Sequence, residues 1–60
     1  MYVVSIRNKV TKKEEGPVLF TGSDTEYKSV KDGIDAAQQW IDSQDNKGDF
    51  EVKYRIVGCL

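Results

Sequence analysis

Two spacings of apolar residues alternate along this chain. Residues 2–6 and 50–57 carry an apolar side chain at every second position, which is typical of a strand with one buried face. Residues 29–44 carry apolar side chains three and four positions apart, as an amphipathic helix does. A short apolar run at 18–21 precedes the helix. The pattern therefore predicts the order β-β-α-β, an α+β fold in which one helix packs on one face of a three-stranded sheet.

This order of elements also predicts how the strands are arranged. A strand-helix-strand connection almost always joins parallel strands, so we expect the strand at 50–57 to run parallel to the strand at 18–21. The amino-terminal strand then lies between them, antiparallel to both, in an antiparallel or mixed sheet of order 2-1-3. The segment 11–17 is polar and ends in Gly16 and Pro17, which predicts a long hairpin loop. These elements use nearly all sixty residues, so we expect a single small domain over 1–60.

Alternation assigns the strand side chains to two faces. The residues expected on the core side are Tyr2, Val4 and Ile6 of the first strand, and Phe50, Val52, Tyr54 and Ile56 of the last. The run at 18–21 is too short to fix its own facing, because either Val18 and Phe20 or Leu19 alone can point inward. We favour the orientation that turns Val18 and Phe20 into the core.

The helix has a defined start and a defined inner face. Ser29 is followed three residues later by Asp32, a variant of the capping box in which the acidic residue also complements the helix dipole. Glycine inside a helix costs about 1 kcal/mol relative to alanine, so Gly33 indicates that the helix backbone lies close to the sheet. The apolar stripe consists of Val30, Ile34, Ala37 and Ile41, with Gly33, Ala36 and Trp40 beside it. We expect Trp40 at the margin of the core, and the helix to end by the segment 45–49.

Composition limits the classes of protein that this fold can represent. Nine Lys and Arg against ten Asp and Glu give a formal net charge of −1, so no overall field attracts nucleic acid or an anionic membrane. The single Cys forms no internal disulfide, which favours a reducing compartment. No stretch approaches the roughly 20 apolar residues that span a bilayer, and no signal-peptide pattern follows Met1. We therefore expect a cytoplasmic protein that does not bind membranes.

The residue types that most catalysis needs are missing. The chain has no His, which removes the commonest general base and the commonest transition-metal ligand. Cys59 has no His partner and is interpreted as an ordinary residue at the end of a strand. Acidic residues near the helix end, including Asp42, Asp45 and Asp49, do not follow the spacing of a calcium loop, and the glycines form no phosphate-binding motif. We expect no enzyme activity, no metal and no cofactor.

The face of the sheet opposite the helix is the surface left for a partner. We call it the open face. Alternation places on it Val3, Ser5, Arg7, Lys9, Leu19, Glu51, Lys53, Arg55 and Val57. Four of these residues are cations in a chain that is slightly acidic overall, so we expect the acidic residues to gather on the helix side and in the loops.

Two interpretations of this face involve no nucleic acid. In one, Lys and Arg simply protect the sheet edges from aggregation and bind nothing. In the other, the open face or an exposed strand edge binds another protein. The residues that we expect to contact that protein are Arg7, Lys9, Lys53 and Arg55, through charge complementarity, and Val57, through apolar contact.

A third interpretation is a nucleic-acid interface. The same four cations would contact phosphates, with Lys12 and Lys13 of the hairpin loop reaching a groove or a single strand. Sheets that bind single strands stack bases on aromatic rings, whereas Tyr2, Phe50 and Tyr54 are assigned to the core. Nucleic-acid binding is therefore the alternative to protein binding rather than the first choice.

We favour a small non-enzymatic protein-binding module of the inhibitor, adaptor or regulatory accessory type. Chains this short are often regulators, including the accessory proteins of phages and mobile elements. A homodimer is a separate hypothesis, motivated by the small core and by two open sheet edges. Trp40 is a second candidate for partner contact, because aromatic residues dominate binding interfaces.

Overall fold

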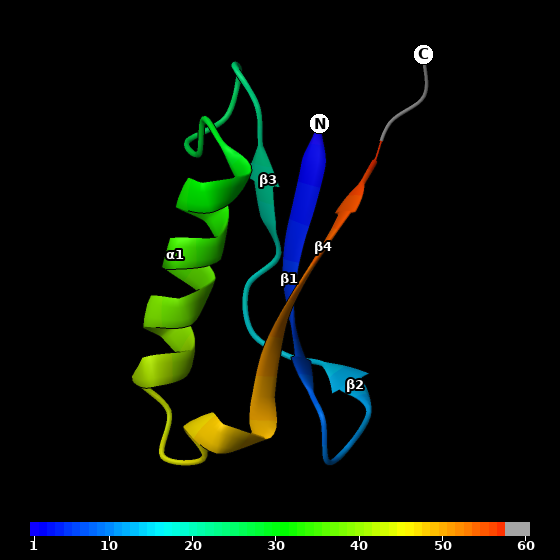
Figure 1. Ribbon diagram of the computed structural model, residues 1–60, viewed down its shortest axis with the longest axis vertical. Coiled ribbons are helices and arrows are strands. Elements are labelled where there is room, and N and C mark those ends of the chain that lie inside the picture. The colour runs from blue at the N-terminus through cyan, green and yellow to red at the C-terminus, as the bar shows by residue number, and fades with distance from the viewer. Residues whose placement is uncertain (58–60) are drawn as a thin grey trace.

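The computed structural model describes residues 1–57 and confirms the α+β fold (Figure 1). The elements are strand β1 (Tyr2–Asn8), strand β2 (Lys13–Glu14), strand β3 (Leu19–Thr21), helix α1 (Val30–Asp42), the short 3-10 helix η1 (Lys47–Asp49) and strand β4 (Phe50–Ile56). Strands β1, β3 and β4 are the three that the sequence predicts, and β2 is an addition within the expected hairpin loop. The interpretation of Cys59 concerns a residue outside the described range.

Strand β1 is the centre of the sheet and is antiparallel to its three neighbours. Strand β4 pairs with all of β1, from Tyr2 opposite Ile56 to Asn8 opposite Phe50. Since β4 occupies one edge of β1 completely, β3 and β2 share the other edge, with β3 at residues 2–4 and β2 at residues 7–8. Strands β3 and β4 therefore run in the same direction on either side of β1, and the predicted order is confirmed.

The turn between β1 and β2 is tighter than the sequence predicts. The Asn8 side-chain oxygen accepts hydrogen bonds from the N–H groups of Val10 and Thr11, at 2.8 and 3.1 Å. The Asn8 carbonyl accepts a third bond, from the Lys12 N–H at 2.8 Å. Lys12 adopts a left-handed backbone with φ 66°. Because Asn8 satisfies these backbone donors, the chain reverses within residues 9–12 and leaves Lys13 and Glu14 free to pair with β1.

The favoured orientation of the second apolar run is wrong. Leu19 lies opposite Val4 and packs against the core, whereas Phe20 lies opposite Val3 and is 48% exposed. Val18 is also exposed. The physical reason is the next residue, Thr21, which is buried beneath the helix and therefore turns Leu19 to the same face by the two-residue period.

Helix α1 begins as the sequence predicts. The Ser29 hydroxyl oxygen accepts a hydrogen bond from the Asp32 N–H at 3.2 Å, which satisfies one of the unpaired donors of the first turn. The close approach inferred from Gly33 is also confirmed. A Cβ atom at Gly33 would lie 2.9 Å from the Thr21 methyl group and 3.0 Å from a methyl group of Val4. The helix ends at Asp42, before the segment 45–49.

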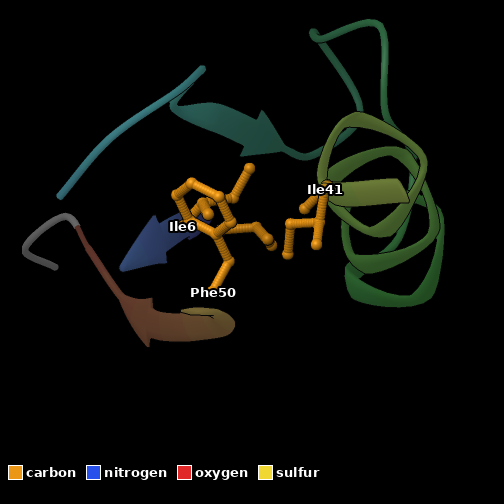
Figure 2. Close-up of a cluster of buried hydrophobic side chains, with 5 residues drawn as sticks. Ile6, Ile41 and Phe50 are labelled. Atoms are coloured by element: carbon orange, nitrogen blue, oxygen red, sulfur yellow. The ribbon is translucent and has the colours of Figure 1, made fainter. Parts of the chain in front are cut away.

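The core lies between α1 and the sheet (Figure 2). Its buried members are Val4, Ile6, Ala37, Ile41 and Phe50. Trp40 is at the margin, as expected, and meets the edge of Phe50 with ring centroids 5.3 Å apart and an interplanar angle of 81°. This T-shaped contact closes the end of the core where β4 starts.

The core does not extend along the whole of β4, so part of the predicted core list is wrong. Phe50 is buried and Val52 packs against the core, but Tyr54 is 60% exposed and Ile56 is 72% exposed. Tyr2, which pairs with Ile56, is 37% exposed. Figure 1 shows the reason, because the carboxyl-terminal half of β4 diverges from α1 with β3 and β1 between them. The alternation is correct, but α1 does not cover this end of the sheet.

Candidate protein-docking surface

Side chains on the open face form rows across the strands, and the first row is apolar and cationic. Val3 lies opposite Phe20 on one side and opposite Arg55 on the other. Val3 is only 3% exposed although no helix covers this face, whereas Phe20 and Arg55 are exposed. The two long side chains therefore flank a buried apolar centre. We call Phe20, Val3 and Arg55 the apolar row.

The second row is charged. Arg7 lies opposite Glu14 on one side and opposite Glu51 on the other. The Arg7 Nη1 atom is 3.6 Å from the Glu51 Oε1 atom, and the Lys53 Nζ atom is 3.2 Å from the same oxygen. The Ser5 hydroxyl, in the neighbouring row, donates to the Glu14 Oε1 atom at 3.3 Å. We call Glu14, Arg7 and Glu51 the charged row.

The charged row compensates much of the positive charge expected on this face. A hydrogen bond from Lys53, together with the charges of Lys53 and Arg7, lowers the pKa of the Glu51 carboxyl below its ordinary value. Glu51 is therefore ionised at neutral pH and pairs with both cations. Within the described residues, Arg55 forms no ion pair, so the uncompensated positive charge of the two rows lies in the apolar row, across Val3 from Phe20.

The residues proposed for partner contact fall into three places. Arg7 and Lys53 are brought together by Glu51 in the charged row. Arg55 belongs to the apolar row. Lys9 follows the end of β1 as an exposed turn residue, and Val57 directly follows β4 as a half-buried residue. The structure therefore separates the expected basic patch into a compensated half and a half in which only Arg55 remains.

The lysines of the hairpin do not extend this patch. Lys12 lies in the turn, and Lys13 pairs with Asn8, which has the same facing as Val4 and Ile6. It is Glu14 that shares the face of Arg7. The hairpin therefore contributes a carboxylate to the open face and turns Lys13 to the helix side.

A shallow depression of about 300 Å³ lies beside the apolar row. It is lined by Val18, Leu19, Phe20, Thr25, Glu26 and Tyr27. The loop that forms one wall is held to β3 by the bridge between Thr21 and Tyr27 and by a 2.8 Å hydrogen bond from the Gly22 N–H to the Tyr27 carbonyl. Among the aromatic residues, Phe20 and Tyr27 are the two that the sequence leaves as candidates for a free position, although the favoured facing turned Phe20 into the core, because the period of a three-residue strand gives no facing on its own.

Comparisons with known proteins indicate no function, so a proposal must rest on the geometry described above. No protein-family model matches the chain, and no curated protein or solved structure shows significant similarity to it. Across residues 1–57, no helix combines the length and the apolar character needed to cross a bilayer. In the same range, no three or more Cys, Asp or Glu side chains gather in a way that could hold a metal ion.

Proposed function

We propose that this protein is a small non-enzymatic protein-binding module, of the inhibitor, adaptor or regulatory accessory type, that docks through the apolar row of the open face. The observation that carries the proposal is the exposed Phe20, which lies between the shallow depression and the pair Val3 and Arg55. Aromatic and Arg side chains supply a large share of the binding energy in protein interfaces. The proposal keeps the cytoplasm as the compartment, on the basis of the single Cys.

The chemistry of the row defines the partner that fits it. The depression is small and mostly apolar, so it suits a single apolar side chain rather than an extended ligand. Arg55 is exposed and suits a carboxylate, which it can bind through two parallel hydrogen bonds. The partner surface therefore presents an apolar group with an acidic residue close to it.

Protein binding is better supported than nucleic-acid binding. Glu14 and Glu51 lie on the same face as the cations, so a phosphate backbone crossing the sheet would meet two carboxylates. Lys13 faces the helix side, and the net charge of the chain is −1. Phe20 is a single exposed ring on this face, whereas stacking platforms for single strands use several.

Comparison of two capture experiments tests the proposal. Tagged wild-type protein and Phe20→Ser are each incubated with lysate of the source organism, with and without nuclease, and the retained proteins are quantified by mass spectrometry. We expect one protein to be retained by the wild type regardless of nuclease and to be lost with Phe20→Ser. Val10→Ser is the matched control, because Val10 is an exposed apolar residue in the turn, outside the open face.

A second pair of variants tests the cationic part of the row. Arg55→Glu should also lose the retained protein, whereas Lys31→Glu, a charge reversal on the exposed surface of α1, should keep it. Thermal melts followed by circular dichroism establish that each variant is folded. Retention of the partner by both Phe20→Ser and Arg55→Glu would refute the docking surface. Retention that is broad, sensitive to nuclease and steeply weakened by salt would instead indicate nucleic-acid binding.

A further inference from the structure

The outer edge of β4 has unpaired backbone groups. The Val57 N–H donates to the Met1 carbonyl at 2.9 Å, and the Asp49 carbonyl accepts from the Lys9 N–H at 2.7 Å, so odd-numbered residues turn their backbone groups toward β1. Val52, Tyr54 and Ile56 turn both their N–H and C=O groups to the opposite side, whereas the Phe50 N–H donates to the Lys47 carbonyl and only the Phe50 C=O remains for this edge. Within residues 1–57, β4 pairs with β1 alone. An edge of this kind is a template for a further strand.

The sequence of this edge is complementary to itself when read in the antiparallel direction. Val52 is preceded by Glu51 and Asp49 and followed by Lys53 and Arg55. A second copy of β4, antiparallel and centred on Val52, places each Glu51 opposite a Lys53 of the other copy. It also places each Asp49, the last residue of η1 directly before the strand, opposite an Arg55. Every charged position near this edge then meets the opposite charge.

The other registers that preserve the facing of the side chains lack this property. A register centred on Lys53 places Lys53 opposite itself. A register centred on Tyr54 places Lys53 opposite Arg55, and one centred on Glu51 places two carboxylates opposite each other. A shift by a single residue exchanges the two faces of one copy, which opposes core-side residues to charged ones. The charges therefore select the register centred on Val52.

Backbone hydrogen bonding agrees with the same register. It pairs Val52 with Val52 and Phe50 with Tyr54. Both backbone groups of Val52 and Tyr54 face the edge, and Phe50 offers its C=O, which can accept from the Tyr54 N–H of the other copy. The charged residues then occupy the non-hydrogen-bonded positions, where opposite side chains approach more closely. On the helix side, Tyr54, which is exposed in the monomer, lies against Phe50 and its neighbour Trp40.

We propose that β4 is the interface of a homodimer in which two copies pair antiparallel about Val52. The product is one continuous sheet with both α1 helices on the same face and both open faces on the other. The proposal does not depend on the docking function, because Phe20 and the depression lie on β3, on the opposite side of β1 from this edge. Arg55 is the one residue of the apolar row that lies on β4, where it would also face Asp49 of the other copy. Figure 1 shows β3 and the carboxyl-terminal part of β4 on different sides of β1.

Sedimentation equilibrium from micromolar to millimolar protein tests the dimer. Reductant is present throughout so that Cys59 cannot cross-link two chains. We expect the wild type to change from monomer to dimer mass as its concentration rises. Glu51→Lys and Lys53→Glu each place like charges opposite each other at two symmetric positions, so each should associate at least about tenfold more weakly. Monomer mass for the wild type at every concentration would overturn the proposal.

Mixing the two variants tests the register. Glu51→Lys is basic at positions 51 and 53, whereas Lys53→Glu is acidic at both, so an equimolar mixture should form a heterodimer although each variant alone is weakened. The double variant Glu51→Lys/Lys53→Glu should recover the dimer, because it exchanges the charges within each opposing pair. Recovery in the mixture also shows that the single variants are folded. A mixture that stays as weak as its components, or a double variant that stays monomeric, would overturn the register centred on Val52.

A backbone variant tests the edge separately from its charges. The Tyr54 N–H faces outward, so Tyr54→Pro removes a donor from the free edge while leaving the bonds to β1 in place, as edge strands tolerate. Tyr54→Pro should be monomeric with a cooperative thermal melt, and Lys31→Glu, a charge reversal on α1, should dimerise like the wild type. A folded Tyr54→Pro that still dimerises would show that β4 is not the interface.

Discussion

Gly33 sets the distance between the helix and the sheet. Glycine is the least favourable helix residue apart from proline, yet here any side chain would meet the methyl groups of Thr21 and Val4 within about 3.0 Å. Both of these neighbours are buried and lie in strands β3 and β1, so neither can withdraw. The intrinsic cost of glycine in α1 is therefore offset by the close packing that it permits.

This contact predicts that Gly33→Ala destabilises the protein although alanine is the better helix former. Overpacking of this kind typically costs about 1–3 kcal/mol. The better helix propensity of alanine returns roughly 1 kcal/mol, so the net change in the free energy of unfolding is a loss for all but the smallest overpacking costs. Urea unfolding should show a lower midpoint for Gly33→Ala. Gly48→Ala is the matched control, because a Cβ atom at Gly48 meets nothing within 4 Å, and its midpoint should not fall. A Gly33→Ala protein more stable than the wild type would contradict the close approach.

Glu51 predicts a pH dependence of stability. Its pKa is lowered in the folded protein, chiefly by the hydrogen bond from Lys53, so the unfolded chain binds the proton more readily. The stabilisation that ionised Glu51 contributes is therefore complete above the ordinary carboxyl pKa of 4.5, and it is lost as the pH falls through the lowered pKa of the folded protein. Urea midpoints of wild type and Glu51→Gln should differ at pH 7, and the difference should shrink as the pH falls from 4.5 through the lowered pKa of Glu51. Glu26→Gln, in the loop before α1, serves as the control carboxylate, and an unchanged difference at both pH values would contradict the prediction.

At the scale of elements, the helix was predictable because its signals are local. The cap at Ser29 and the stripe through Ile34, Ala37 and Ile41 depend only on spacing within one segment, and both are confirmed. The position of β1 between β3 and β4 was also predictable, because the direction of a strand-helix-strand connection restricts the topology.

The facing of β3 and the coverage of β4 were not predictable from local signals. The three residues of β3 follow the packing of Thr21 beneath Gly33, which is a contact between elements. Alternation correctly places Tyr54 and Ile56 on the helix side of β4, but the length and tilt of α1 decide which part of that side is covered. The sequence consequently assigned Arg55 but not Phe20 to the proposed docking surface, since Phe20 was expected to face the core.

One residue of the β1–β2 hairpin has an unfavourable backbone conformation, and a substitution can relieve it. Lys12 has φ 66°, in the left-handed region that glycine adopts without a steric penalty. Lys12→Gly should therefore stabilise the protein by a few tenths to about 1 kcal/mol, the steric gain being reduced by the greater entropy of glycine in the unfolded chain. Lys13→Gly, in β2, should instead destabilise it. Thermal melts of the two variants check this, and a lower melting temperature for Lys12→Gly would contradict it.

At the scale of the whole molecule, the sheet offers two surfaces that are separated by β1. Phe20 and the depression lie on β3, and the proposed dimer edge is on β4, which also carries Arg55 of the apolar row. Of the four cations that the sequence predicts on the open face, Arg7, Lys53 and Arg55 lie there and Lys9 lies in the turn. Glu14 lies opposite Arg7, and Glu51 pairs with Arg7 and Lys53. The charge balance of the open face depends on strand pairing, because Glu14 lies on this face as a result of the pairing of β2 with β1.

The separation of the two surfaces predicts that they can be inactivated independently. Phe20→Ser should abolish partner capture and leave the dimer mass in sedimentation unchanged. Tyr54→Pro should abolish the dimer and leave partner capture in place, because Phe20 and Tyr27 are unaffected. Loss of both properties in either variant, with an intact thermal melt, would mean that the partner binds only the dimer.

The pairing of β1 with β4 also determines when the protein can fold during its own synthesis. Strand β1 is translated before its partners, and within residues 1–57 the neighbour that pairs with its full length is β4, which ends at Ile56. Chains are made at about 5–20 residues per second from the amino terminus, and until β4 emerges, β1 has only β2 and β3 on one edge. The sheet is therefore completed only once β4 has been made, and a chain arrested before residue 50 exposes the free edge of β1 to other nascent chains.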